Sequence, residues 1–230
     1  MELLTLQPQY PRTGWYGKLP SLGDFASRRL QAGFIERWDD WLQQSMGASR
    51  ELLGEDWTDL YLGCHVWRFV LMPGVIGAEA WAGVLMPSVD RVGRYFPLTI
   101  CTSMPARAPL GMSLSSLDHW LEQLELCALS ALDPDGGLDS LESGLQGLPA
   151  LQLGPRSEGL GAESALMFFA AGEKTASSLE QMAARMLPDS LRGKSLWWCS
   201  DEQGSGAGLI RPNLPGVQDF LSMLSCRPAG

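Results

Sequence analysis

One stretch of the chain, residues 83–102, constrains the fold more than any other. Its two ends, residues 84–86 and 95–102, are apolar runs typical of buried strands. The polar connector between them, residues 87–94, contains a proline and a glycine, which predict a turn and exclude a continuing helix. The sequence therefore predicts two buried strands that are joined by a charged turn.

The charges of this connector allow two interpretations. Asp90, Arg91 and Arg94 lie within five residues at the end of two apolar strands. They form either a salt-bridged structural corner or a recognition loop that a rigid sheet holds in place. The connector alone does not choose between the two.

Regular apolar patterns predict the layers around this stretch. Strand-like runs at 66–72 and 80–86, followed by 95–102, are joined by short links and predict an antiparallel meander. Apolar residues recur at three- and four-residue steps over 34–46 and 114–132, which predicts two helices that face the core.

Arg68 is a cation inside an apolar predicted strand. A buried guanidinium is costly unless it is paired. The sequence therefore predicts that Arg68 has a carboxylate partner or lies at an exposed edge.

The last third of the chain alternates between strands and helices. Strands are predicted at 165–170 and 195–199, with a short strand or turn at 208–211, and helices follow Ser177 and Pro215. This order predicts a partly parallel sheet. Together with the meander it gives the expected fold class, a three-layer α/β sandwich with a mixed central sheet and helices on both faces.

Length and composition predict one domain. The chain has 230 residues, of which 45% are hydrophobic, enough to fill a core. We expect a single α/β domain over 1–230 with a loose N-terminus at 1–13. Residues 133–164 are rich in Gly, Leu, Ser and Pro and are expected to form a long connection, either a mobile loop or a seam between two lobes, with a possible short helix at 138–148.

Charge and composition exclude several classes of function. The 26 acidic against 17 basic residues leave a net charge of −9, which argues against binding to nucleic acid or to an anionic membrane. No signal peptide and no membrane-spanning run is recognisable, so we expect a cytoplasmic protein without membrane insertion. The five cysteines are far apart in sequence and the two histidines are isolated, so neither a disulfide framework, a metal site nor a cofactor is expected.

Four segments together resemble a known family. They are Gly17-Lys-Leu-Pro-x-x-Gly-Asp-Phe25, the aromatic helix at 34–41, the long motif at 83–99 and Ser195-Leu-Trp-Trp198. This set resembles the TagF/ImpM family of type VI secretion-associated proteins of Gram-negative bacteria, over about residues 14 to 224. The resemblance implies a three-layer α/β sandwich and a cytoplasmic, post-translational repressor of type VI secretion. The implied partner is the forkhead-associated-domain scaffold of that machine, and no catalytic residues are carried over.

The residues themselves allow two main classes of function. One is a non-enzymatic binding module, and the other is a hydrolase-like enzyme that uses Ser88, Asp90 and Arg94 at the strand ends, with Asp24 as a possible base. The enzyme would need a base beside a nucleophile. The sequence has no Gly-x-Ser-x-Gly elbow and no metal-ligand cluster, which favours the binding module. A purely structural subunit is the third alternative.

The candidate protein-binding residues are charged side chains of the shared motifs: Lys18, Asp24, Arg28, Arg29, Asp90, Arg91 and Arg94. If the fold brings the cations together, they form a basic patch suited to carboxylates or to a phosphorylated segment. Alternatively, Asp24 and Asp90 neutralise them inside the fold. The sequence leaves both arrangements open.

Overall fold

The computed structural model describes residues 13–104, 114–149, 151, 191–200 and 206–226. Within them, strands form one sheet in the order β2-β1-β5-β4-β3-β6-β7, and every pair of neighbouring strands is antiparallel. The strands are β1 (Gly14–Gly17), β2 (Ala26–Arg28), β3 (Trp67–Leu71), β4 (Ala80–Met86), β5 (Leu98–Met104), β6 (Lys194–Ser200) and β7 (Gly206–Pro212).

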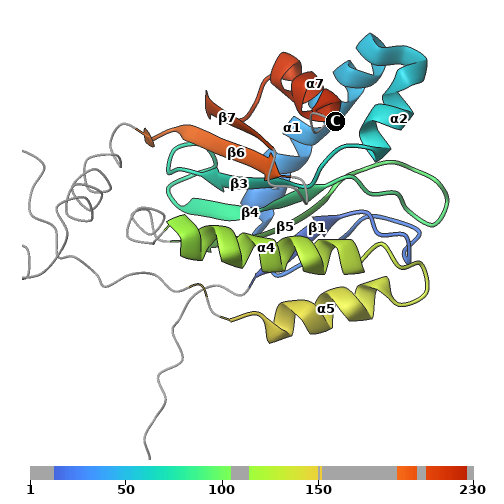
Figure 1. Ribbon diagram of the computed structural model, residues 1–230, viewed down its shortest axis with the longest axis horizontal. Coiled ribbons are helices and arrows are strands. Elements are labelled where there is room, and N and C mark those ends of the chain that lie inside the picture. The colour runs from blue at the N-terminus through green and yellow to red at the C-terminus, as the bar shows by residue number, and fades with distance from the viewer. Residues whose placement is uncertain (1–12, 105–113, 150, 152–190, 201–205, 227–230) are drawn as a thin grey trace, which may run out of the picture.

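Helices cover both faces of this sheet (Figure 1). The helices of one face are α1 (Ala32–Leu53), α2 (Trp57–Leu62) and α7 (Val217–Ser225), and a 3-10 turn at Gly54–Asp56 joins the first two. The helices of the other face are α4 (Leu114–Ser130) and α5 (Gly137–Gly147). The prediction of helices on both faces is therefore confirmed for the described part of the chain.

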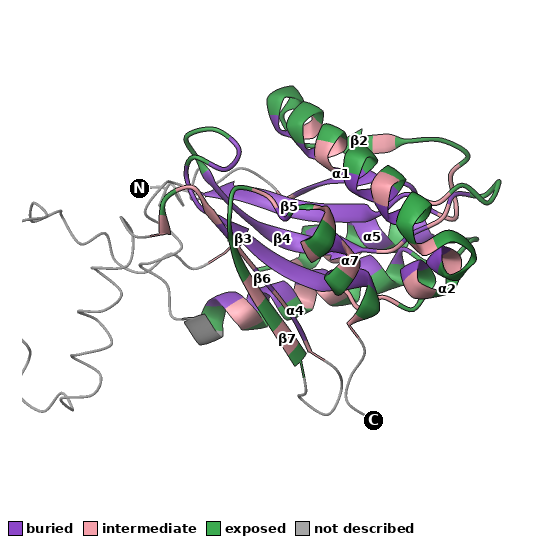
Figure 2. Ribbon diagram, turned by 90° about the horizontal axis from the view of Figure 1, so that it is seen from above, coloured by how far each residue is buried: buried purple, intermediate pink, exposed green. Residues whose placement is uncertain are grey.

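The central strands β3, β4 and β5 are buried along their whole length (Figure 2). Both faces are buried because alternate side chains enter two different cores. In β3, Phe69 packs among the aromatic residues of α1, whereas Val70 packs with the apolar residues of α4. In β4, Trp81 lies in the same core as Phe69, and Ala82 lies in the same core as Val70. This two-residue alternation explains why the sequence pattern of β3, β4 and β5 is almost continuously apolar.

Arg68 of β3 meets the predicted requirement for a carboxylate partner. Its guanidinium lies 2.8 Å from a carboxylate oxygen of Asp118 and 2.9 Å from one of Glu125, both on α4. The indole N–H of Trp198 in β6 donates to the same Asp118 oxygen at 2.9 Å. One buried cation thus joins the sheet to the helix that covers it.

The meander of β3, β4 and β5 is confirmed, but the predicted parallel half of the sheet is wrong for the described strands. The last strands, β6 and β7, pair antiparallel with each other, and β6 pairs antiparallel with β3. The link from β6 to β7, residues 201–205, is too short for the crossover helix that a parallel pair needs. Strand and helix alternation predicts parallel strands only where the helix itself connects two neighbouring strands.

Two other predictions concern the long connection and the ends of the chain. The interval 133–164 contains α5, which confirms the predicted short helix at 138–148, and the Leu141 side chain of this helix is buried in the same core as residues of α4. The predicted strand at 165–170, the helix after Ser177 and almost all of the loose N-terminus lie outside the described residues.

Gly83 explains why the central motif begins with a glycine. It lies opposite Cys101 in the β4–β5 pair. A Cβ atom at this position would be 2.3 Å from the carbonyl oxygen of Ile100 and 2.5 Å from the Cβ of Cys101. The two central strands therefore approach each other too closely at this position for a residue with a Cβ atom.

Candidate functional site

The turn between β4 and β5 extends beyond the sheet as a narrow hairpin, which we call the hairpin tip (residues 87–96). Val89 and Tyr95 form a bridge, and the N–H of Phe96 donates to the carbonyl of Ser88 at 3.1 Å. Gly93 has φ of +83°, a conformation that favours glycine, and its N–H donates to the Asp90 carbonyl at 2.9 Å. The predicted turn is therefore confirmed, and its geometry is that of an ordered hairpin.

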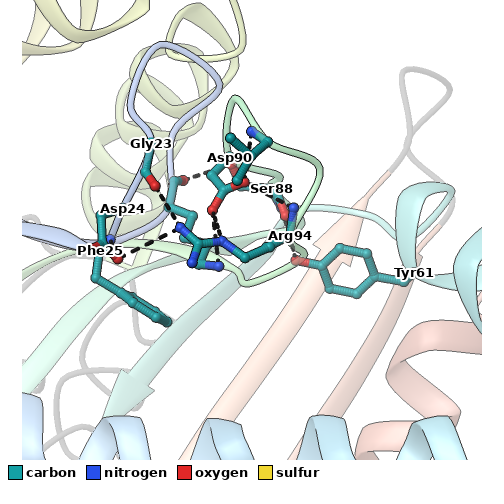
Figure 3. Close-up of polar contacts among 9 residues, drawn as sticks. Gly23, Asp24, Phe25, Tyr61, Ser88, Asp90 and Arg94 are labelled. Atoms are coloured by element: carbon teal, nitrogen blue, oxygen red, sulfur yellow. Dashed lines mark hydrogen bonds and ion pairs between the residues drawn. The ribbon is translucent and has the colours of Figure 1, made fainter.

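The carboxylate of Asp90 organises the hairpin tip (Figure 3). It accepts the N–H groups of Val92 at 3.0 Å and Arg94 at 2.9 Å, and the Arg94 Nε at 2.7 Å. The ammonium of Lys18 lies 3.1 Å away, and the Asp90 side chain is 0% exposed. Burial alone would raise the pKa of Asp90, but the donors of Arg94, Lys18 and Val92 outweigh it and hold the pKa well below its usual range.

A second loop, residues 18–25, is fastened to the hairpin tip. The N–H of Arg91 donates to the carbonyl of Leu22 at 2.9 Å, and the guanidinium of Arg94 donates to the carbonyl of Gly23 at 2.5 Å. The same guanidinium lies 3.8 Å from the carboxylate of Asp24 (Figure 3). These contacts join two of the motifs that carried the family resemblance into one surface.

Phe25 lies at the edge of this surface and is held by neighbouring rings. Its ring centroid is 4.7 Å from that of Phe96 and 6.0 Å from that of Tyr16, and the Lys18 ammonium is 4.8 Å from its centre. Phe25 nevertheless remains 45% exposed, and Val92 at the end of the hairpin is 64% exposed. We call the exposed residues of this region the tip surface: Asp24, Phe25, Arg91, Val92 and Arg94.

The predicted basic residues do not form one patch. Arg28 and Arg29 pair with Glu142 of α5, at 3.5 Å and 2.7 Å. The indole N–H of Trp15 donates to the same carboxylate at 2.6 Å. Burial opposes the ionisation of Glu142, but the bonds from Arg29 and Trp15 lower its pKa. Arg28 and Arg29 therefore belong to a contact between the sheet and α5, separate from the ion pairs of Asp90.

Ser88 does not present a nucleophile. It is 2% exposed, and its hydroxyl donates to the carbonyl of Lys18 at 2.7 Å. Its main-chain N–H and carbonyl both bond to the hydroxyl of Tyr61, at 3.0 Å and 2.9 Å. Ser88 therefore fixes the start of the hairpin tip, and the ionised Asp90 beside it is already saturated with donors.

Among the described residues, no group of three His, Cys, Asp or Glu side chains is arranged to hold a metal ion. None of the described helices has both the length and the apolar character needed to cross a membrane.

The lowered pKa values of Asp90 and Glu142 predict a loss of stability in acid. Unfolded carboxyls titrate near about 4, so the native state binds fewer protons there, and stability falls as pH drops through that value toward the lower native pKa. Thermal melts between pH 7 and pH 3 should show a smaller decrease for Asp90→Asn than for the parent. Asp40→Asn, at an exposed position of α1, is the control and should follow the parent. Equal decreases for the parent and Asp90→Asn would contradict this role of Asp90.

Sequence reasoning missed three contributors to these arrangements. Glu142 and Tyr61 act on residues that are distant in sequence, and no local pattern identifies such a partner. Val92 could have been noticed, because it is an aliphatic residue in the middle of a charged turn.

Comparison with known proteins agrees with this arrangement. Residues 14–148, more than half of the chain, match the TagF N-terminal domain, which is type VI secretion system-associated. The crystal structure of PA0076 from Pseudomonas aeruginosa PAO1 is similar, with a TM-score of 0.75 and 39% sequence identity over 93% of this chain and 94% of that chain. No curated protein sequence matches the chain significantly. The resemblance found in the motifs is thereby confirmed, and the chain belongs to the TagF family of type VI secretion-associated proteins.

Proposed function

We propose that this protein is a cytoplasmic, non-enzymatic regulator that represses assembly of the type VI secretion machine. In this proposal it binds the forkhead-associated-domain scaffold of the machine through the tip surface. Membership of the TagF family supports the association with type VI secretion. The observation that carries the binding role is the rigid presentation of an apolar and cationic surface by the buried Asp90.

Rigidity matters because a binding surface that is ordered before association loses less entropy on binding. Two of the donors to Asp90 are the main-chain N–H groups of Val92 and Arg94, which fix the main chain around Val92. The bond from Arg91 to Leu22 fixes the hairpin against the neighbouring loop. The exposed side chains are therefore presented by an ordered backbone.

The chemistry of the tip surface indicates what it binds. Aromatic residues and arginine are enriched among residues that dominate binding energy, and Phe25, Arg91 and Arg94 are exposed together here. Arg91 has no side-chain ion pair or hydrogen bond within the described parts of the chain. Its guanidinium can therefore pair with a carboxylate of the partner. We expect the scaffold to present carboxylates around an apolar depression that receives Val92 or Phe25.

Isothermal titration of the purified scaffold into this protein tests the proposal. Val92→Asp should weaken binding by about 30-fold or more, because losing a central apolar anchor typically costs about 2 kcal/mol. Its melting temperature should stay within a degree or two of the parent, since Val92 is exposed. Leu52→Asp, at an exposed position on α1, is the matched control and should bind like the parent.

Two results would contradict the proposal in different ways. Parent-like binding by a well-folded Val92→Asp variant would show that the interface lies elsewhere on the protein. Failure of the parent protein to bind the scaffold would remove the scaffold as the partner and leave only the association with type VI secretion.

A further inference from the structure

Two cysteines that are distant in sequence lie in contact on the face of the sheet that α1 covers. Cys199 is in β6, and Cys226 directly follows the last residue of α7. Their sulfur atoms are 4.0 Å apart. Cys199 is buried, whereas Cys226 is partly exposed, so only one member of the pair is open to reagents in solution.

We propose that Cys199 and Cys226 form a thiol modification site at which a small disulfide, such as oxidised glutathione, introduces an internal disulfide bond. A disulfide has a sulfur–sulfur distance of about 2.05 Å, so the two sulfurs must approach by about 2 Å. Cys226 has an extended backbone conformation beyond the helix, so a shift of this residue breaks no helical turn. The buried Phe220, Met223 and Leu224 keep α7 on the sheet during this shift.

The reaction proceeds by two thiol–disulfide exchanges. The accessible Cys226 thiolate attacks one sulfur of oxidised glutathione, which forms a mixed disulfide and releases one glutathione. The Cys199 thiolate then attacks the Cys226 sulfur, and the second glutathione leaves. The protein loses two electrons and two protons, and the oxidant gains both as two glutathione thiols.

The environment of Cys199 determines the rate of the second thiol–disulfide exchange. Burial, together with the neighbouring Cys226, raises the pKa of Cys199 to about 11. The thiolate is the attacking species, so closure of the bond should be slow at neutral pH and faster as pH rises. Cys64 is a poorer competitor because its sulfur is engaged with the carbonyl of Met223 at 3.3 Å and burial raises its pKa to about 12.

The bond would fasten the end of α7 to β6. Closing a loop of this length constrains the unfolded chain, and for a protein of this size we expect a rise in melting temperature of about 5–10 °C. The same bond would hinder separation of α7 from α1, which it contacts through Trp41 and Phe220.

The experiment is to incubate the native protein with oxidised glutathione at pH 8 and to record intact mass, non-reducing peptide maps and melting temperature. The expected product has lost two hydrogen atoms and contains a cross-linked pair of peptides that carry Cys199 and Cys226. It should melt higher than the reduced protein and revert with dithiothreitol. Cys226→Ser should abolish the cross-link, whereas Cys127→Ser, a buried cysteine in the core on the other face, should leave it unchanged.

Several outcomes would overturn the proposal. These are a glutathione adduct on Cys226 that never resolves, a cross-link to Cys64 instead of Cys199, or a protein that stays fully reduced. A cross-link that appears only after the protein is unfolded would also contradict a site built by the native structure.

Discussion

Replacing Trp38 by alanine is expected to lower the free energy of unfolding by about 3–5 kcal/mol. Trp38 lies on α1, is 0% exposed, and its ring packs against those of Phe69 and Trp197 in the sheet. Its indole N–H donates to the hydroxyl of Thr99 in β5 at 2.7 Å. Alanine would leave a large cavity between helix and sheet and a buried hydroxyl without its donor.

Such a loss is a large share of the about 5–15 kcal/mol that stabilises a typical domain. Urea unfolding measures the change directly, and thermal melts should show a decrease of roughly 6–20 °C for a protein of this size. Trp38→Phe should cost less than Trp38→Ala, because it keeps part of the ring contacts, although it loses the bond to Thr99 and one of the two indole rings. Glu36→Ala, on the exposed side of the same helix, should change stability by less than about 0.5 kcal/mol. A parent-like melting temperature for Trp38→Ala would contradict the packing of α1 on the sheet.

The elements predicted correctly from sequence are those whose pattern is local. In α1 the apolar stripe over 34–46 repeats at helical spacing, and in β3 and β4 the short apolar runs are bounded by turn residues. The apolar face of such an element is visible in the spacing of nearby residues in the sequence. It can therefore be recognised without knowing which other elements pack against it. The same reasoning explains the correct expectation that Arg68 has carboxylate partners, since the cost of burying a guanidinium does not depend on where the partner comes from.

Strand direction and long-range partners could not be predicted in the same way. Whether β6 runs parallel or antiparallel to β3 depends on the path of the intervening chain, and that path leaves no periodic signal. Helix α5 has a weak sequence signal because its surroundings are rich in glycine and serine, although Leu141 is fully buried in the core.

The residues of the hairpin tip divide into a set that forms ion pairs and a set that is exposed, and a recognition role for the exposed set stays a proposal. Asp90, Lys18 and Arg94 form the salt-bridged corner, and Arg91 and Val92 are exposed on the hairpin that this corner supports. The sequence could not separate these roles, because Arg91 and Arg94 are chemically alike and differ only in what surrounds them after folding.

This difference predicts opposite results for two charge reversals. Arg91→Glu should leave the melting temperature nearly unchanged, because surface substitutions usually alter stability by less than about 0.5 kcal/mol. Arg94→Glu should lower it markedly, because it places a second carboxylate beside the buried Asp90 and removes the bonds to Asp90 and Gly23. A variant with both reversals would therefore fail to fold well, and its loss of binding would say nothing about the interface.

Arg91→Glu alone separates folding from binding. If the tip surface contacts the scaffold, removal of a paired interfacial charge should cost roughly 2–5 kcal/mol of binding, which weakens association by well over tenfold. Titration of the scaffold at low and moderate salt measures this loss, and the difference between parent and variant should shrink as salt screens the charge. Arg37→Glu, an exposed reversal on α1, makes the same change in net charge and should bind like the parent. Equal losses for Arg37→Glu and Arg91→Glu would attribute the effect to net charge, and parent-like binding by a folded Arg91→Glu variant would exclude Arg91 from the interface.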